Sequence, residues 1–131
     1  MNTPPMGFGS PAVLVVDDVR DAADSTALLL TLHGFRLRAC YDGVSALQAA
    51  ATDPPDVVLT DVVMPGMDGW TLIRRLREQT VGTPPFVIVV SGLCKTEDQQ
   101  KSAEAGADLH LVKPVVPAEL ISILSRLQKS E

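Results

Sequence analysis

The sequence predicts an α/β fold in which helices cover both faces of a parallel β-sheet. Three continuous apolar runs, at 13–16, 57–59 and 86–90, have the pattern of strands that are buried on both faces. Segments with helical periodicity lie between the strands, so strand and helix alternate five times along the chain. This alternation requires right-handed crossovers, which place helices on both faces of one sheet.

Two further strands have weaker patterns. Residues 35–39 alternate apolar side chains with two arginines, which is typical of an edge strand with one face toward the core and one toward water. The fifth strand, at 109–112, is short and is interrupted by His110. The three continuous apolar runs therefore form the centre of the predicted sheet.

Four of the five helices show apolar residues at the spacing of one helix face. The first runs from about residue 20 to residue 33, where Gly34 is a stop signal, and the second ends before Pro54-Pro55. The fifth helix opens near Pro117. The apolar positions of the second, third and fifth helices are Val44, Leu47 and Ala51; Leu72, Ile73 and Leu76; and Leu120, Leu124 and Leu127.

The fourth helix, from about residue 96 to residue 105, has a different composition. Its only apolar residues are Ala103 and Ala105, so it can bury little surface. We therefore expect it to be the least firmly held element of the fold, and we expect it to move.

Length and composition indicate one acidic domain. The 131 residues suffice for a single core, and we expect residues 1–10 to form a flexible tail or linker ahead of a domain at 11–131. Asp and Glu number 16 against 11 Lys and Arg, which argues against direct nucleic-acid binding. No apolar stretch reaches the ~20 residues of a membrane span. Cys40 and Cys94 lie in unrelated contexts, so we expect a reduced, cytoplasmic setting.

Polar side chains follow the ends of four predicted strands. Asp17 and Asp18 follow the first strand, Asp61 the third, Ser91 the fourth and Lys113 the fifth. In open α/β sheets, ligands bind outside the carboxyl ends of the strands, so these groups should meet where chemistry is expected. Crowded carboxylates repel one another, and Mg²⁺ would hold them while leaving room for a phosphate. The set indicates a phosphoryl site.

Most of these residues, taken one at a time, also have a simpler interpretation. An acidic pair after a strand is often a helix cap, and Asp68 ahead of Gly69 has the same pattern. Ser91 alone could cap a turn, and Lys113 alone could be a solvated surface residue. Their joint placement at strand ends favours the phosphoryl site.

The ordered motifs resemble those of the receiver domains of bacterial two-component signalling, over about residues 11–128. The resemblance implies a flavodoxin-like (βα)5 receiver fold with sheet order 2-1-3-4-5. It also implies that the Lys113–Pro114 peptide bond is cis. The motifs are Asp17-Asp18, Asp61-x-x-Met64-Pro65-Gly66-Met67-Asp68-Gly69, Ser91-Gly92 and Lys113-Pro114.

The resemblance assigns a role to each residue of the site. Asp61 would accept a phosphoryl group from a histidine kinase or a histidine phosphotransfer protein, forming an aspartyl phosphate. Lys113 and Ser91 would contact the phosphate oxygens. The Mg²⁺ cofactor would be bound directly by Asp18, Asp61 and the backbone carbonyl of Val63, and through water by Asp17.

Three positions differ from the usual family pattern. His110 stands where the family usually has Tyr or Phe, an aromatic switch residue that turns inward together with the Ser or Thr hydroxyl. Histidine is smaller and more polar, so both a switch role with Ser91 and a solvent-facing side chain stay open. Val63 and Leu93 flank the path of a hydrolytic water and are apolar, so neither can orient that water, which predicts a long-lived phosphoryl group.

Output is expected through a downstream protein that binds the face built from the fourth helix, the fifth strand and the fifth helix. A homodimer stays open, as does the choice between a stand-alone receiver and part of a larger protein such as a hybrid kinase.

Two other functions compete with the phosphoryl switch. One is a degenerate receiver acting as a phosphorylation-independent interaction module. The other is a Mg²⁺-dependent aspartyl-phosphate phosphohydrolase, although an Asp-x-Asp motif after the first strand and a cap segment are missing from the sequence.

Overall fold

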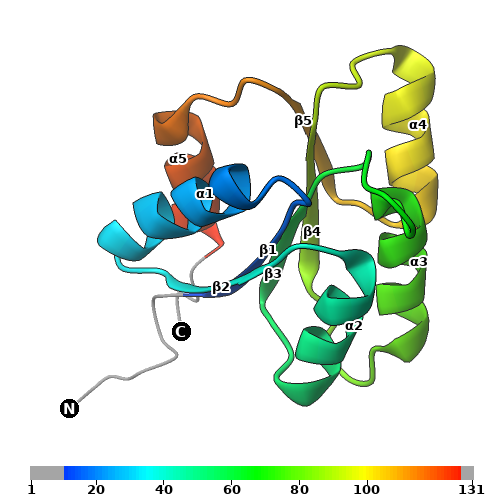
Figure 1. Cartoon of the computed structure of the whole chain (residues 1–131), viewed down its shortest axis with the longest axis horizontal. Coiled ribbons are helices and arrows are strands. Elements are labelled where there is room, and N and C mark those ends of the chain that lie inside the picture. Colours follow the sequence, from blue (N-terminus) through cyan, green and yellow to red (C-terminus); the bar gives the residue numbers. More distant parts are fainter. Residues whose placement is uncertain (1–10, 128–131) are drawn as a thin grey trace.

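The computed structural model describes residues 11–127 and follows the predicted alternation of strands and helices (Figure 1). The tail expected at 1–10 lies outside the described residues, as do residues 128–131. The strands are β1 (Ala12–Val16), β2 (Arg36–Cys40), β3 (Val57–Thr60), β4 (Phe86–Ser91) and β5 (Leu109–Val112). The helices are α1 (Arg20–Leu32), α2 (Gly43–Thr52), α3 (Gly69–Gln79), α4 (Thr96–Ala105) and α5 (Pro117–Arg126).

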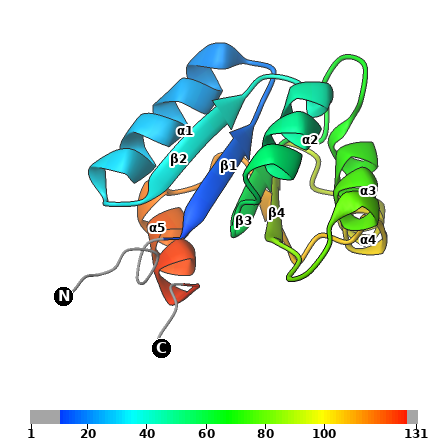
Figure 2. The ribbon, with the colours of Figure 1, turned by 90° about the horizontal axis from the view of Figure 1, so that it is seen from below.

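The five strands form one parallel sheet in the order β2-β1-β3-β4-β5, which confirms the predicted topology. Strand β2 lies at one edge, as its alternating pattern predicts (Figure 2). Strand β5 lies at the other edge. Because β1 and β3 are neighbours at the centre, Val16 pairs with Thr60, and the residues that follow them leave the sheet at the same level.

Helices α1 and α5 cover one face of the sheet, and α2, α3 and α4 cover the other (Figure 1). Successive strand residues point to opposite faces, so β1 contributes Val13 and Val15 to one core and Leu14 and Val16 to the other. The α1–α5 side also contains Leu30, Ile88 and Leu124, and the α2–α4 side contains Val58, Val87, Leu72, Ile73 and Leu76.

Strands β3 and β4 each extend one residue beyond their apolar runs. The added residues are Thr60 and Ser91, and both side chains are fully buried. Helix α1 ends at Leu32, and Gly34 has φ +92°, a left-handed conformation that glycine adopts without steric cost. The stop signal predicted at Gly34 is therefore confirmed.

Helix α4 buries little apolar surface, as its composition predicts. Its buried residues are Ser102 and Ala105, whereas Ala103 faces solvent. The polar Ser102 thus takes a place in the interior that the pattern of apolar residues does not reveal. That α4 moves stays a prediction.

Candidate functional site

The two central strands bring Asp17 and Asp61 to the same edge of the sheet. Each residue directly follows its strand, and the backbone N–H of Asp61 donates to the carbonyl of Val16 at 3.1 Å. The Thr60 hydroxyl donates to the carbonyl of Asp61 at 2.8 Å. The backbone of Asp61 is therefore held from both sides, and its carboxylate projects from a fixed position beside Asp17.

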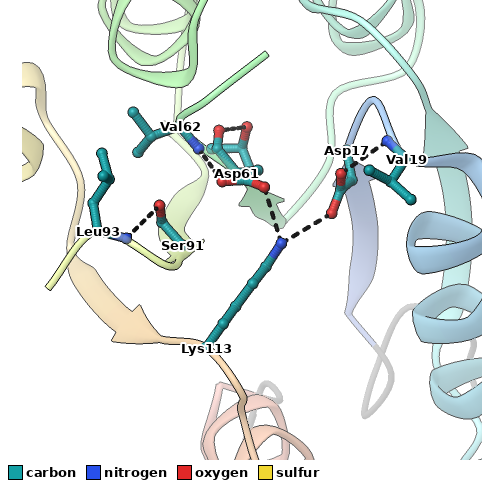
Figure 3. Close-up of polar contacts among 8 residues, drawn as sticks. Asp17, Val19, Asp61, Val62, Ser91, Leu93 and Lys113 are labelled. Carbon is teal, nitrogen blue, oxygen red and sulfur yellow. Dashed lines mark hydrogen bonds and ion pairs between the residues drawn. The ribbon is translucent and has the colours of Figure 1, made fainter.

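The ammonium group of Lys113 joins these two carboxylates (Figure 3). Its Nζ lies 2.9 Å from Asp61 Oδ2 and 3.4 Å from Asp17 Oδ2. The side chains of Asp61 and Asp17 are 13% and 11% exposed, and that of Lys113 is 38% exposed, so the cation closes the solvent side of a shielded acidic pair. Lys113 lies at the surface, as its simpler interpretation expects, but its ammonium is paired with two carboxylates rather than with solvent alone.

The fold holds Lys113 in place and favours its charged form. Its backbone N–H donates to the carbonyl of Ser91 at 2.9 Å, and the Lys113–Pro114 bond is cis, as the resemblance implies. Burial by itself lowers the pKa of Lys113, but the hydrogen bond and charge of Asp61, with those of Asp17, outweigh it. The net pKa of Lys113 is raised above its ordinary value, so the group stays a cation at neutral pH.

Both carboxylate groups have one oxygen committed to the backbone. Asp61 Oδ1 accepts from the N–H of Val62 at 2.6 Å, and Asp17 Oδ1 accepts from the N–H of Val19 at 3.0 Å. Asp17 therefore makes a turn contact ahead of α1, while Val19, the residue before the helix, makes no side-chain cap. In each carboxylate the other oxygen is directed toward the Lys113 cation.

Helix α3 begins directly behind Asp61. The predicted cap is confirmed, because the Asp68 carboxylate accepts from the N–H of Thr71 at 2.8 Å. The N–H of Gly69 donates to the carbonyl of Val62 at 2.8 Å. A Cβ atom at Gly69 would lie 2.0 Å from the carbonyl oxygen of Asp61, so only glycine fits. The sequence shows Gly69 as part of a motif but does not reveal this close approach.

Ser91 ends β4, the strand that neighbours β3 on the side away from β1, so Asp61 lies between Asp17 and Ser91 in the sheet order. Its hydroxyl is buried and accepts from the N–H of Leu93 at 3.2 Å (Figure 3). The turn-capping interpretation of Ser91 therefore describes a real contact. Ser91 also lies at the carboxyl end of β4, as predicted, and its contact with Leu93 is compatible with that position.

The residues present fit a Mg²⁺ ion, although the described residues 11–127 contain no group of three or more His, Cys, Asp and Glu side chains that could hold a metal by themselves. Asp17 and Asp61 already direct one oxygen each at the same cation, Lys113 Nζ. Mg²⁺ is commonly bound by one or two carboxylates, with waters and substrate phosphate completing its shell. Asp18 is half-buried beside Asp17, and Val63 follows two residues after Asp61 with an exposed side chain. The ligand roles of Asp18 and Val63 stay predictions.

His110 lies partly buried, and both of its ring nitrogens contact protein groups. Nε2 lies 2.8 Å from the carbonyl oxygen of Leu93, and Nδ1 lies 2.8 Å from the hydroxyl of Ser102. Ser102 also accepts from the indole N–H of Trp70 at 2.9 Å. The solvent-facing interpretation of His110 is wrong. The sequence gives no signal for this network, because its members come from four separate segments.

Comparison with known proteins identifies the class of this fold and site. The family profile of the response regulator receiver domain matches residues 13–125. The chain is 40% identical over 121 residues to the transcriptional regulatory protein PrrA of Mycobacterium tuberculosis, which covers 92% of this chain and 51% of PrrA. The chain belongs to the response regulator receiver family.

Solved structures agree with this assignment. The chemotaxis protein CheY4 of Vibrio cholerae superimposes with a TM-score of 0.84 at 29% identity, covering 90% of this chain and 98% of CheY4. The BeF3-activated receiver domain of DrrB has a TM-score of 0.80 at 26% identity, covering 90% of this chain and 97% of that domain. The chain spans about half the length of the first curated relatives that it matches. Within residues 11–127, no helix combines the length and apolar character needed to cross a membrane.

Proposed function

We propose that this receiver accepts a phosphoryl group on Asp61 from the phosphohistidine of a histidine kinase or histidine phosphotransfer protein, in a Mg²⁺-dependent reaction in the cytoplasm. One observation supports this proposal most directly. The Lys113 ammonium lies 2.9 Å from Asp61 Oδ2 at the carboxyl edge of the sheet, beside a second carboxylate, Asp17. A cation held at an acidic strand end is suited to a phosphate that carries negative charge.

In the proposed transfer, an oxygen of Asp61 forms a bond to phosphorus while the bond from phosphorus to the donor's imidazole nitrogen breaks. The released imidazole takes up a proton. Lys113 pairs with one oxygen of the transferred group, and the Ser91 hydroxyl donates to another. A Mg²⁺ ion held by Asp18, Asp61 and the carbonyl of Val63, with Asp17 acting through water, would neutralise the charge on that group.

The output of this domain is proposed to be a protein contact at the face of α4, β5 and α5. PrrA is a transcriptional regulatory protein, and this chain covers 51% of it, so a DNA contact would belong to a segment of a longer protein. The net charge of -5 supports the expectation that the receiver does not itself bind nucleic acid. Whether the domain forms a homodimer stays open.

Intact-protein mass measurement after incubation with acetyl phosphate tests this proposal. With Mg²⁺, the parent should gain the mass of one phosphoryl group, and chelation of Mg²⁺ should prevent the gain. Asp61→Asn should abolish labelling because an amide is a poor nucleophile. Asp21→Asn is a matched control, since Asp21 is exposed in the first turn of α1.

Three results would contradict the proposal. Labelling of Asp61→Asn at the parent rate would show that the acceptor is another residue. A parent that takes up no phosphoryl group would favour the interaction module that works without phosphorylation. Steady release of phosphate from small phosphate esters, with no stable adduct, would instead revive the phosphohydrolase.

A further inference from the structure

A hollow of about 600 Å³ lies between α1 and α5, on the face of the sheet that these two helices cover (Figure 1). The floor of this α1–α5 hollow is formed by residues of three strands, and its walls come from the two helices. The floor includes Val15, Leu59 and Val90, and the walls include Leu29 of α1 and Leu120 of α5. The volume lies within the range of about 300–1,000 Å³ that is usual for small-molecule sites.

The hollow exists because α1 places few large side chains against the sheet. Of its thirteen residues, the buried ones are Ala23 and Leu30. The residues that α1 contributes to the hollow include the small side chains of Ala22 and Thr26. Protein interiors are normally close-packed, and the other face of the sheet is filled by large aliphatic side chains of α3. The face under α1 and α5 is therefore underfilled.

The walls of the hollow are mainly apolar, and several of these side chains are incompletely covered. Leu29, Val90 and Val115 line the hollow and are half-buried. Val90 and Val115 also pack against the core on this face of the sheet. Removing such apolar surface from water favours the binding of apolar molecules. An occupant of the hollow should therefore have an apolar body.

One end of the hollow reaches the carboxylate pair of the candidate site. Asp17, Asp61 and Lys113 line the hollow at this end. The Lys113 ammonium carries three N–H donors, and within residues 11–127 its acceptors are Asp61 Oδ2 and Asp17 Oδ2. A third N–H is thus available to an acceptor on a molecule that occupies the hollow.

The charges at this end determine which kind of acceptor fits. Two carboxylates against one ammonium leave an excess of one negative charge, so a carboxylate or phosphate on the occupant would be repelled. An ammonium on the occupant would have to compete with Lys113 for the same two oxygens. A neutral carbonyl oxygen can accept from Lys113 without either cost.

We propose that the α1–α5 hollow binds an uncharged small molecule that has an apolar body and a carbonyl oxygen, which accepts from Lys113. Binding in the hollow does not depend on phosphorylation. One consequence does rest on the proposed function, because an ammonium turned toward the hollow is less available to a phosphoryl group on Asp61. The ligand and the phosphoryl group should therefore weaken each other's binding.

Acetophenone is the probe, because it is a neutral aryl ketone, and ethylbenzene is its counterpart without the oxygen. Titration should shift the methyl resonances of Val15, Leu29 and Leu120, which line the hollow. Acetophenone should bind more tightly than ethylbenzene by about two- to tenfold, as one net hydrogen bond provides. In Lys113→Met this advantage should disappear, while ethylbenzene should still bind.

Filling the hollow separates binding at this site from unspecific binding. Ala22→Leu adds volume to the α1 wall and should weaken acetophenone binding by about fivefold or more. Ala118→Leu is the matched control, because Ala118 is exposed on α5 and does not line the hollow; it should bind acetophenone like the parent. Should Ala22→Leu not fold, Val115→Phe fills the hollow from the segment before α5.

Three results would overturn the inference. The first is an absence of methyl shifts, or shifts confined to the face under α2, α3 and α4. The second is a filled variant that binds acetophenone like the parent. The third is an equal affinity of the parent for acetophenone and ethylbenzene.

Beryllofluoride with Mg²⁺, a mimic of the phosphoryl group on Asp61, tests the consequence for phosphorylation, with binding followed by ¹⁹F NMR. Saturation with acetophenone should weaken beryllofluoride binding by about fivefold or more. An unchanged affinity would refute the shared use of Lys113. A parent that binds no beryllofluoride would refute the proposed function, whereas the acetophenone titrations would still decide whether the hollow is a binding site.

Discussion

Substituting Gly69 by alanine should displace the acceptor residue without touching its side chain. The added Cβ would lie 2.0 Å from the carbonyl oxygen of Asp61 and 2.9 Å from the Cα of Val62. Both neighbours are backbone atoms, and the Asp61 carbonyl also accepts from the Thr60 hydroxyl at 2.8 Å. The strain therefore falls on the backbone of Asp61, because no flexible side chain can move aside.

The size of the effect follows from that distance. Real Cβ contacts essentially never fall below 3.0 Å, so the carbonyl of Asp61 must move by about 1 Å from its 2.0 Å separation. Overpacking of this kind costs about 1–3 kcal/mol, of which alanine's better helix propensity recovers at most about 1 kcal/mol. The net loss therefore lies between about 0 and 3 kcal/mol, and its middle range of about 1–2 kcal/mol corresponds to a melting temperature lower by about 3–10 °C. A 1 Å displacement at a reacting group can slow its reaction about 10²-fold.

Thermal unfolding and the rate of labelling by acetyl phosphate measure the two effects separately. Gly92→Ala is the control for stability, because a Cβ at Gly92 would meet nothing within 4 Å and its φ lies outside the left-handed range. We expect that control to melt close to the parent. If Gly69→Ala melts like the parent and is phosphorylated at the parent rate, the close approach of α3 does not position Asp61.

Three further predictions concern the metal, the lifetime and the charge of the site. Millimolar Mg²⁺ should raise the melting temperature of the parent, because a ligand that binds only the folded state stabilises it; an equal rise in Asp18→Ala would contradict the assigned ligand. The double variant Val63→Asn, Leu93→Glu should lose its phosphoryl group faster, by up to the ~10²–10⁴-fold that groups orienting water contribute. An unchanged decay rate would show that these two side chains do not control the lifetime of the phosphoryl group. Lys113 has a pKa above 10.5 in the fold, so its stabilising contribution is complete below pH 10.5 and is lost as pH rises through the raised pKa. Urea unfolding at a series of alkaline pH values should therefore show that the parent's higher free energy of unfolding relative to Lys113→Met decreases as pH rises. A difference that stays constant with pH would contradict the raised pKa of Lys113.

The sheet could be predicted because its signals are local. Buried central strands need continuous apolar runs, and the edge strand β2 needs alternation, so both patterns are visible in short windows of sequence. The polar residues that follow strand ends must then meet, because parallel strands deliver their carboxyl ends to one edge. For this reason the sequence alone predicts that Asp17, Asp61 and Lys113 lie together.

The positions that sequence reasoning missed depend on contacts between distant segments. Residue 69 must be glycine because α3 starts against the backbone of Asp61. The residues around Gly69 in the sequence do not predict this close approach. Ser102 lies in a strongly polar helix, where a serine is expected to face water. It is buried because its hydroxyl is bonded by Trp70, 32 residues earlier, and by His110, 8 residues later.

The burial of Ser102 shows how α4 is held on the domain. A helix anchored by apolar side chains loses its position only when a large area is exposed, whereas one held by a few directional bonds can shift when a single partner changes. Helix α4 belongs to the second kind, since its deepest residue is a serine whose bonds lead to Leu93 and from there to Ser91. The weakness of the α4 pattern in the sequence therefore follows from the way the helix is held. The directional bonds of Ser102 to Trp70 and His110, more than apolar packing, therefore set the position of α4.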